Sequence, residues 1–390
     1  MSAGPDQPQT LSVALVDRVA DVPPADWDAC AGTANPFVGH TFLRLLEESG
    51  SVGEGTGWGP QHLTVRDAAG RLVGCAPLYV KTHSQGEYVF DHGWANALNQ
   101  AGGRYYPKLQ VSVPFTPVPG PRLLTHAQAP AGTRRAMMDA LATIARQNRL
   151  SSVHATFTTA EEHEEFGEAG WLQRLGTQFH WENRGYTDFD DFLAAFSSRK
   201  RKAVRKERRE VADSGLEILS LTGPDLKPEH WDAFDKLYRA TSDRKWGSPY
   251  LTKRFFHLLG EAMPDKVLLV MARDGGRWVG GALNLIGADT LYGRNWGGAG
   301  EYPYLHFECC YYRAIEFAIE HGLKRVEAGA QGEHKIQRGY LPVPTYSAHY
   351  ITHPGLRRAV ADFLERETPA MEATIQAYGE ESPYRKDGEG

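Results

Sequence analysis

Ionisable side chains are concentrated in residues 328–349, which read AGAQGEHKIQRGYLPVPTYSAH. Residues 324–328 and 345–351, on either side, have the β-branched and apolar composition of buried strands. A polar turn held between core strands is a common position for binding and catalytic groups. We interpret this turn as a candidate site, the alternative being a solvated loop without a function. Its candidate residues are Gln331, Glu333, His334, Lys335, Arg338, Tyr340 and His349.

A second candidate site is a basic run, in which eight of the eleven residues 199–209 are lysine or arginine. In a helix, Arg201, Arg205 and Arg208 share one face, where like charges repel by roughly 0.2–0.5 kcal/mol per pair. An anion lying against that face would remove the repulsion. We therefore predict a site for the phosphate of coenzyme A, of a nucleotide-sugar or of RNA, the alternative being a solvated connector. Its predicted residues are Arg199, Arg201, Lys202, Arg205 and Arg208.

Length and composition limit the classes of protein to which the chain can belong. With 390 residues, the chain is long enough for two domains. The net charge of −5 gives no overall attraction to nucleic acid or anionic membrane, so any basic site must be local. Four cysteines without paired spacing predict neither a metal site nor a disulfide framework. A polar N-terminal sequence and the lack of a long apolar run lead us to expect a cytoplasmic protein without a membrane span.

These candidate sites lie within a sequence that shows signs of duplication. A strand pattern, a tryptophan-bearing helix start, a glycine hairpin and a glycine–aromatic pair occur twice in the same order. The matched positions include Trp27 and Trp231, residues 67–74 and 274–280, Gly170 and Gly339, and His180 and His349. We predict two copies of one α/β unit, each a mixed, largely antiparallel sheet flanked by helices. The first copy has an extra segment, roughly residues 93–132, whose prolines at 105–122 either line a cleft or brace the surface.

The predicted domain organisation follows from this repeat. Residues 307–319 have the apolar spacing of one continuous amphipathic helix in the second copy. We also expect a single helix to contain residues 189–209. The predicted segments are a disordered start (1–10), a first domain (11–185), a basic connecting helix (186–212), a second domain (213–377) and a disordered tail (378–390).

Four stretches of the chain resemble a known family. They are FHWENRGYTDFDDFL (179–193), SSRKRK (197–202), LHFECCYY (305–312) and EAGAQGEHK (327–335). The sequence is similar to the FemAB-like group of predicted N-acyltransferases, often labelled peptidoglycan biosynthesis or recognition proteins, from about Asn35 to about Leu364. The resemblance implies two GNAT-type acyltransferase folds in tandem and transfer of an acyl or aminoacyl group to an amine.

The resemblance also implies which partners to expect. Acyl-coenzyme A and aminoacyl-tRNA are the two candidate co-substrates, and no tightly bound cofactor or metal is expected. A small amine or a peptidoglycan precursor is the expected acceptor, and tRNA is a candidate partner. Two non-catalytic alternatives stay open, in which the basic helix binds nucleic acid or the protein binds a cell-wall fragment.

Acyl transfer to an amine requires a base that removes a proton. Glu327 is the first candidate, because it alternates with apolar neighbours in a predicted strand. His334 is the second, although a capping or solvent-facing histidine would fit the same position. The second copy should also bind substrate through Trp296, His306 and Glu308, with Lys335 and Arg338 as anion binders. In the first copy, the predicted acceptor-binding residues are Glu87, Asp91 and Lys108.

Overall fold

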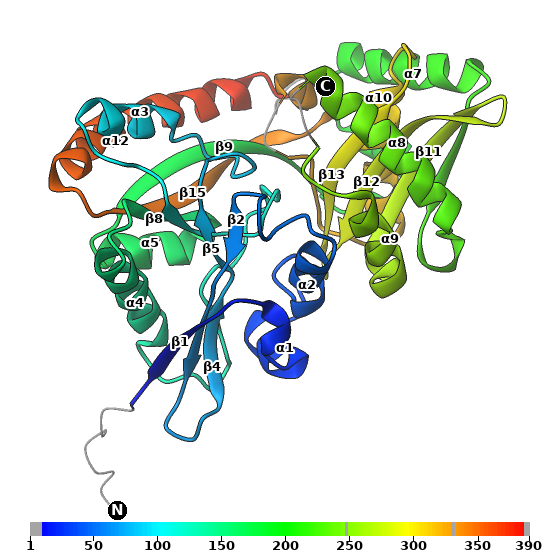
Figure 1. Cartoon of the computed structure of the whole chain (residues 1–390). Helices are drawn as coiled ribbons and strands as arrows, with labels where there is room; N and C mark the ends of the chain where they lie inside the picture. Colours follow the sequence, from blue (N-terminus) through cyan, green and yellow to red (C-terminus); the bar gives the residue numbers. More distant parts are fainter. Residues whose placement is uncertain (1–9, 246–248, 330–331, 386–390) are drawn as a thin grey trace, which may run out of the picture. The chain divides into compact units, whose positions relative to one another are not determined.

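The structure, a computed structural model, describes residues 10–245, 249–329 and 332–385 (Figure 1). The chain divides into two compact units. Unit 1 takes its described residues from Met1–Gly176 and Thr345–Pro369, and unit 2 takes them from Thr177–Pro344 and Ala370–Gly390. Strand β9 (Leu172–Glu182), strand β15 (Leu341–Ile351) and helix α12 (Pro354–Glu380) each contribute to both units.

Unit 1 has a small sheet of order β1-β3-β4-β7 and a larger set of strands in the order β15-β8-β6-β5-β2. Helix α4 and strands β6 and β8 build its apolar core, with Met137, Leu109 and Val153 buried together. Its elements before β9 are β1 (Ser12–Val16), η1 (Val19–Asp21), α1 (Pro24–Ala31), α2 (His40–Glu48), β2 (Trp58–Pro60), β3 (His62–Arg66), β4 (Leu72–Ala76), β5 (Leu78–Lys81), α3 (His92–Gln100), β6 (Lys108–Val111), β7 (Leu124–Thr125), α4 (Thr133–Gln147), β8 (Ser152–Thr158) and α5 (Ala160–Glu168).

Unit 2 has strands in the order β10-β11-β12-β13-β14-β9, and helix α8 lies along strands β12 and β13 (Figure 1). Phe234 of α8 would contact any side chain placed at Gly281, so this glycine lets helix and sheet approach closely. The elements are α6 (Phe189–Ala194), α7 (Ser198–Asp213), β10 (Glu217–Leu221), η2 (Gly223–Asp225), α8 (Pro228–Lys245), α9 (Lys253–Ala262), η3 (Pro264–Lys266), β11 (Val267–Asp274), β12 (Arg277–Ile286), β13 (Thr290–Gly298), α10 (Leu305–Phe307), η4 (Glu308–Tyr312), α11 (Arg313–Glu320), β14 (Arg325–Glu327) and η5 (Glu333–Arg338).

The order of elements confirms the predicted duplication, including both glycine hairpins. The last strands, however, are exchanged between the copies. Strand β9 ends the first copy but pairs with β14 of unit 2, and β15 ends the second copy but pairs with β8 of unit 1. Residues 345–369, which we assigned to a second domain, therefore belong to unit 1.

Two parallel strands diverge in unit 2. Strands β13 and β14 pair only where Thr290–Tyr292 faces Arg325–Glu327. From Gly293 onward, β13 continues to Gly298 and, among the described strands, pairs with β12 alone. A Cβ atom at Gly293 would lie 3.2 Å from the Glu327 carbonyl oxygen, so glycine permits the close approach just before the strands separate. The divergence leaves one edge of β13 without a paired strand in the described chain.

The corresponding strands of unit 1 are β6 and β8, which also pair in parallel over three residues. Because β6 occupies the position of β13, the predicted extra segment at 93–132 is wrong in extent. The additional residues form two pieces, 82–107 before β6 and 112–123 after it. The second piece closes the gap between diverging strands, since Gly120 N donates to Phe157 O and Arg122 Nε donates to Thr156 O at 2.8 Å.

Three other predictions about elements are corrected. The predicted helix 307–319 contains a π-helical segment, η4, between α10 and α11. The predicted helix over 189–209 is two helices, because the chain turns at Ser197, before α7 begins. The predicted disordered tail is ordered where the structure describes it: Tyr384 packs on Phe196 and donates to Gly339 O at 2.9 Å.

Candidate functional site

Glu327 is the last residue of β14 and lies where β13 and β14 begin to diverge. Its side chain is 6% exposed, with Oε2 3.9 Å from His180 Nε2 and Oε1 4.0 Å from Arg325 Nη1. Within the described residues, Oε2 has no hydrogen-bond partner. Burial raises the pKa of Glu327 to about 8, although Arg325 and Arg294 act in the opposite direction. A carboxyl group with this pKa can take up and release a proton near neutral pH.

Two polar side chains lie beside Glu327 on neighbouring strands. His180 faces it across the antiparallel β14–β9 ladder, and Tyr292 is its partner in the parallel β13–β14 ladder. Burial lowers the pKa of His180 to about 3, so this imidazole is neutral at pH 7. Burial, with a smaller contribution from Glu327, raises the pKa of Tyr292. The group therefore carries one ionisable carboxyl between two neutral hydrogen-bonding side chains.

His334, the second candidate base, belongs to a separate aromatic group. This group lies at the start of the interrupted helix, by which we mean α10, η4 and α11 taken together. Its Nε2 lies 2.9 Å from Tyr311 OH, and its ring centroid is 6.1 Å from that of His306 and 5.6 Å from that of Phe307. Trp296 joins this group through an edge contact with His306 at 5.2 Å. The structure thus brings together the predicted residues His334, His306 and Trp296.

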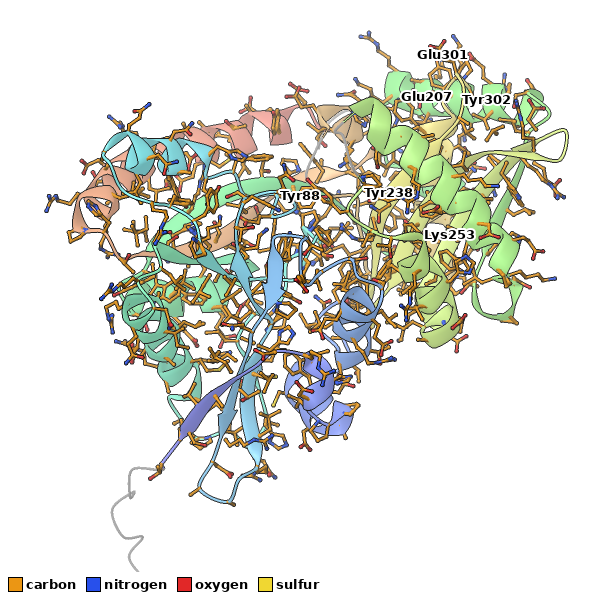
Figure 2. The ribbon with its side chains drawn as sticks, in the orientation of Figure 1. Tyr88, Glu207, Tyr238, Lys253, Glu301 and Tyr302 are labelled. Carbon is orange, nitrogen blue, oxygen red and sulfur yellow. The ribbon has the colours of Figure 1, made fainter. Side chains whose placement is uncertain are left out.

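The two predicted anion binders of the turn already have partners. Arg338 donates from Nε and Nη2 to Glu207 at 3.2 and 2.7 Å; Glu207 projects from α7 (Figure 2). The Arg338 guanidinium also stacks on Phe307 at 3.4 Å. Lys335 is buried and donates to Gly329 O at 3.0 Å, and burial lowers its pKa to about 7. We therefore give Arg338 a structural role in holding η5 against α7. Lys335 is a buried amine that is partly neutral at pH 7.

The remaining residues of the turn have different positions. Glu333 accepts a hydrogen bond of 2.6 Å from Tyr378 OH. Tyr340, a candidate residue of the turn, is fully buried in the core of unit 2 and donates to Tyr311 O at 3.3 Å, so in this structure it has no exposed surface for a substrate. Gln331 lies outside the described residues.

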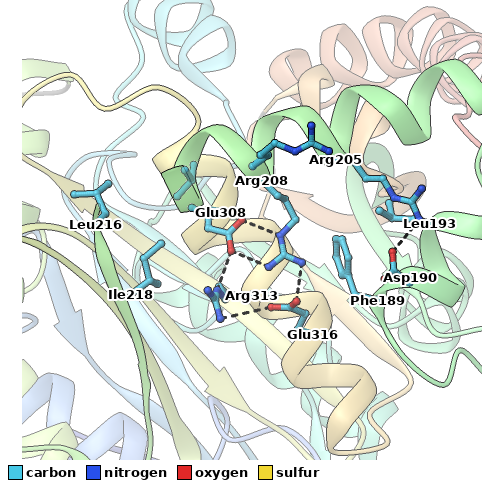
Figure 3. Close-up of a pocket in the computed structure, with 13 residues that line it drawn as sticks. Phe189, Asp190, Leu193, Arg205, Arg208, Leu216, Ile218, Glu308, Arg313 and Glu316 are labelled. Atoms are coloured by element: carbon cyan, nitrogen blue, oxygen red, sulfur yellow. Dashed lines mark hydrogen bonds and ion pairs between the residues drawn. The ribbon is translucent and has the colours of Figure 1, made fainter. Parts of the chain in front are cut away.

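Carboxylates from other elements relieve much of the predicted repulsion in the basic run (Figure 3). Arg208 forms a bidentate pair with Glu308 and a further pair with Glu316 at 2.6 Å. Glu308, 3% exposed, is thereby a counter-ion rather than the substrate-binding residue we expected. Arg205 pairs with Asp190 at 2.9 Å. The exposed side chains of the phosphate prediction are Arg199, Lys202 and Arg205, and Arg201 is half-buried.

The predicted residues of unit 1 form one buried cluster. Lys108 Nζ donates to Glu87 Oε2 at 2.7 Å, to Ser84 Oγ at 2.9 Å and, over a short distance, to Asp91 Oδ2. Three acceptors thus match the three hydrogens of the ammonium group. The structure brings Glu87, Asp91 and Lys108 together as predicted, but pairs them with each other.

Sequence reasoning missed Lys81 and His154 in this cluster. Lys81 is fully buried, 3.8 Å above the Trp58 ring and 3.7 Å from Glu87 Oε1. His154 in β8 pairs with His349 of β15 as Glu327 in β14 pairs with His180 of β9, and the Nδ1 atoms of His154 and His349 lie 2.7 Å apart. The repeat could have revealed His154, because it aligns residue 154 with 327, but an isolated lysine in a strand gave no such signal.

No group of three or more histidine, cysteine, aspartate or glutamate side chains among the described residues could hold a metal ion. No helix in the described part of the chain is long and apolar enough to cross a membrane.

Comparisons with solved structures show the fold. The match to the crystal structure of FemX covers 98% of FemX and 87% of this chain, with a TM-score of 0.53 and 12% sequence identity. L-PGS from Bacillus licheniformis gives a TM-score of 0.51 with 11% identity, covering 98% of its length and 85% of this chain. The C-terminal domain of a putative lysylphosphatidylglycerol synthetase from Agrobacterium fabrum gives a TM-score of 0.54 with 9% identity. That match covers 96% of the domain and 88% of this chain.

These likenesses, with the observed duplication, confirm the predicted tandem GNAT-type α/β fold. A comparison with curated protein sequences gave no match. The sequence matches the family described as peptidoglycan biosynthesis/recognition over residues 18–386, nearly the whole chain. The chain belongs to the FemAB-like family.

Proposed function

We propose that this protein is an N-acyltransferase and that Glu327 is its general base. The observation that carries the proposal is the position of a buried carboxyl group, with one unpartnered oxygen, at the point where two parallel strands diverge. An acyl donor lying against the unpaired edge of β13 would bring its carbonyl group to this point, using main-chain hydrogen bonds as an added strand does.

The reaction balances with the groups present. The acceptor nitrogen attacks the acyl carbon and forms a carbon–nitrogen bond, while Glu327 takes one proton from the nitrogen. The bond to the leaving group then breaks, and the leaving group departs with its electron pair. Neutral His180 lies 3.9 Å from Glu327, beyond hydrogen-bond distance, and adds no competing positive charge. Lys335 is a candidate for donating a proton to the leaving group, because its pKa of about 7 allows both states.

We infer acyl-coenzyme A and aminoacyl-tRNA as candidate donors, and a small amine or a peptidoglycan precursor as acceptor. The family description, peptidoglycan biosynthesis/recognition, supports the precursor. The exposed cations of α7 would contact the phosphates of either donor. A free coenzyme would engage two or three of these cations, whereas an RNA stem could engage more. Binding of RNA should weaken with a slope of about −0.7 to −0.9 per phosphate contacted in a plot of log K against log[salt].

Glu327→Gln tests the mechanism, with Glu320→Gln as the control at an exposed carboxyl of the same unit, the last residue of α11. With the donor that the wild type uses, we expect kcat/KM to fall by about 10²–10⁴ in Glu327→Gln. The wild-type rate should rise with pH around a midpoint of about 8, because only the ionised carboxylate accepts a proton. Loss of that pH dependence in Glu327→Gln, with full activity of Glu320→Gln, supports the assignment. Full activity of Glu327→Gln contradicts it, and His334→Gln is then the next variant.

The second candidate function is binding of nucleic acid by α7 without catalysis. It is favoured by the exposed side chains of Arg199, Lys202, Lys206 and Arg209 on one helix. The two functions differ in a simple measurement. A binding protein would show a steep salt dependence and no turnover with either donor.

A further inference from the structure

Unit 2 contains a cavity of about 460 Å³ whose lining does not include Glu327 (Figure 3). We call it the arginine pocket. It lies among α6, α7, β10 and the interrupted helix, and its volume is in the range of small-molecule sites. Its lining combines four arginines with three acids and an apolar wall: Phe189, Asp190, Leu193, Arg205, Arg208, Arg209, Val211, Ala212, Leu216, Ile218, Glu308, Arg313 and Glu316.

Four of the charged groups neutralise one another in a closed ring. Arg208 lies 2.9 Å from Glu308 and 2.6 Å from Glu316. Arg313 lies 2.8 Å from Glu308 and 3.8 Å from Glu316. Two positive and two negative charges thus cancel at one side of the pocket. The ring holds the side chain of Glu308, which is the first residue of the π-helical segment. Such segments are frequent at functional sites.

The remaining charges do not cancel. Arg205 and Arg209 are one helical turn apart on α7, and Asp190 is the third charged group. Arg205 pairs with Asp190 at 2.9 Å, but both side chains are at least half exposed, so the pair contributes little. Arg209 forms no ion pair with any residue that the structure describes. One positive charge therefore has no counter-charge among the lining residues.

The rest of the lining is apolar. Phe189, Leu193 and Val211 come from α6 and α7, Leu216 directly precedes β10, and Ile218 is its second residue. Strand β10 lies at the end of the strand order of unit 2, and Leu216 and Ile218 stay half-buried there. An apolar wall next to unmatched positive charge is complementary to an occupant that is apolar on one side and anionic on the other.

We propose that the arginine pocket binds a small monoanionic amphiphile, with one negative charge on a hydrocarbon body. The charge sum selects a monoanion, because one anionic group leaves the pocket neutral. Arg209 and Arg205 hold the anionic head, for which their planar guanidinium groups are suited. The body lies against Phe189, Leu216 and Ile218. Arg205 is shared with the cations proposed to contact the donor phosphates, but the lining does not include Glu327, so binding at this site can be measured without turnover.

Isothermal titration of the full chain with octanoate, below its micelle concentration, tests the proposal. The neutral analogue 1-octanol should bind at least tenfold more weakly, since it lacks the charge-assisted hydrogen bonds. Arg209→Glu should weaken octanoate binding by at least tenfold. Arg201→Glu is the matched control, because it makes the same charge change on the same helix outside the pocket; it should change binding less than threefold.

A cavity-filling variant provides an independent arm. Ile218→Trp should abolish octanoate binding while thermal unfolding stays close to that of the wild type, and Leu216→Trp replaces it should that variant fail to fold. Equal loss of binding in Arg209→Glu and Arg201→Glu would show unspecific attraction by α7 and overturn the proposal. Undetectable octanoate binding to the wild type, or equal binding of octanol, would also overturn it.

Discussion

Replacing Lys108 by methionine should strongly destabilise unit 1. Methionine keeps the length of the side chain and removes the ammonium group that Glu87, Asp91 and Ser84 share. Lys108 is fully buried, and the two carboxylates are at most 3% exposed. Removing one member of a buried ion pair costs about 3–5 kcal/mol, because the remaining charge is left without a partner. With two carboxylates left, we expect a loss near the upper end of that range.

The cost should depend on pH in a defined direction. Burial alone would raise the pKa of Asp91, but Lys108 and His154 lower it below its ordinary value. A carboxyl group with a lowered pKa stabilises the native state above about pH 4, and this contribution is lost as the pH falls. The difference between wild type and Lys108→Met should therefore shrink as the pH falls below about 4.

Urea unfolding at pH 7 measures the loss of stability in Lys108→Met. The urea concentration at the midpoint of the unit 1 transition should fall by on the order of 1–2 M. Lys206→Met is the control, since its exposed partner Glu210 lies 3.5 Å away and such pairs contribute about 0–1 kcal/mol. The triple variant Lys108→Met, Glu87→Gln, Asp91→Asn should recover most of the loss, because no unpaired charge remains. A loss below about 1 kcal/mol in Lys108→Met, or no recovery in the triple variant, would refute the reasoning.

Three further predictions concern other groups. Burial lowers the pKa of Lys81 to about 7, so above pH 7 the unfolded state binds more protons than the folded state. The free energy of unfolding should therefore rise from pH 7 to about pH 10. Lys81→Met should abolish that rise, as measured by urea unfolding. Arg338→Met should destabilise unit 2 by about 3 kcal/mol, the lower end of the range for a broken buried pair, because Glu207 loses its cation but keeps the hydrogen bond from Tyr312 OH; a double variant with Glu207→Gln should show a smaller loss by thermal unfolding. Gly293→Val should lower turnover more than stability, because its side chain would push against the Glu327 carbonyl oxygen, which kinetics and thermal unfolding together would show.

Local signals predicted much of the fold. Glycine at the hairpins and tryptophan at the helix starts gave the duplication, because these residues respond to turn geometry and packing within a few positions. The exchange of β9 and β15 had no such signal, since both strands have the same composition whichever unit they join. The π-helical segment was also missed. Its apolar spacing fits an α-helix, whereas its first residue, Glu308, is held by Arg208, 100 residues away.

The candidate site was predictable to a similar extent. Alternation in a strand placed Glu327 apart from its apolar neighbours, and the structure shows it buried at the strand divergence. The basic run was read as repelling charge because the sequence does not show which carboxylates approach it. Pairs such as Arg338 with Glu207, 131 residues apart, arise only from packing. Charge runs therefore predict where cations are, and tertiary contacts decide which of them stay available.

The two copies have diverged at one equivalent position. In unit 2, Glu327 stands beside an edge of β13 that has no paired strand in the described chain. In unit 1, His154 takes that position, and the segment containing Gly120 and Arg122 bonds to β8 where the gap would open. Arg122 is 1% exposed, which makes this closure part of the core. Only unit 2 can then accept an acyl donor in the proposed manner. Titration with the donor should give one binding site per chain, and two equivalent sites would contradict the closure of unit 1.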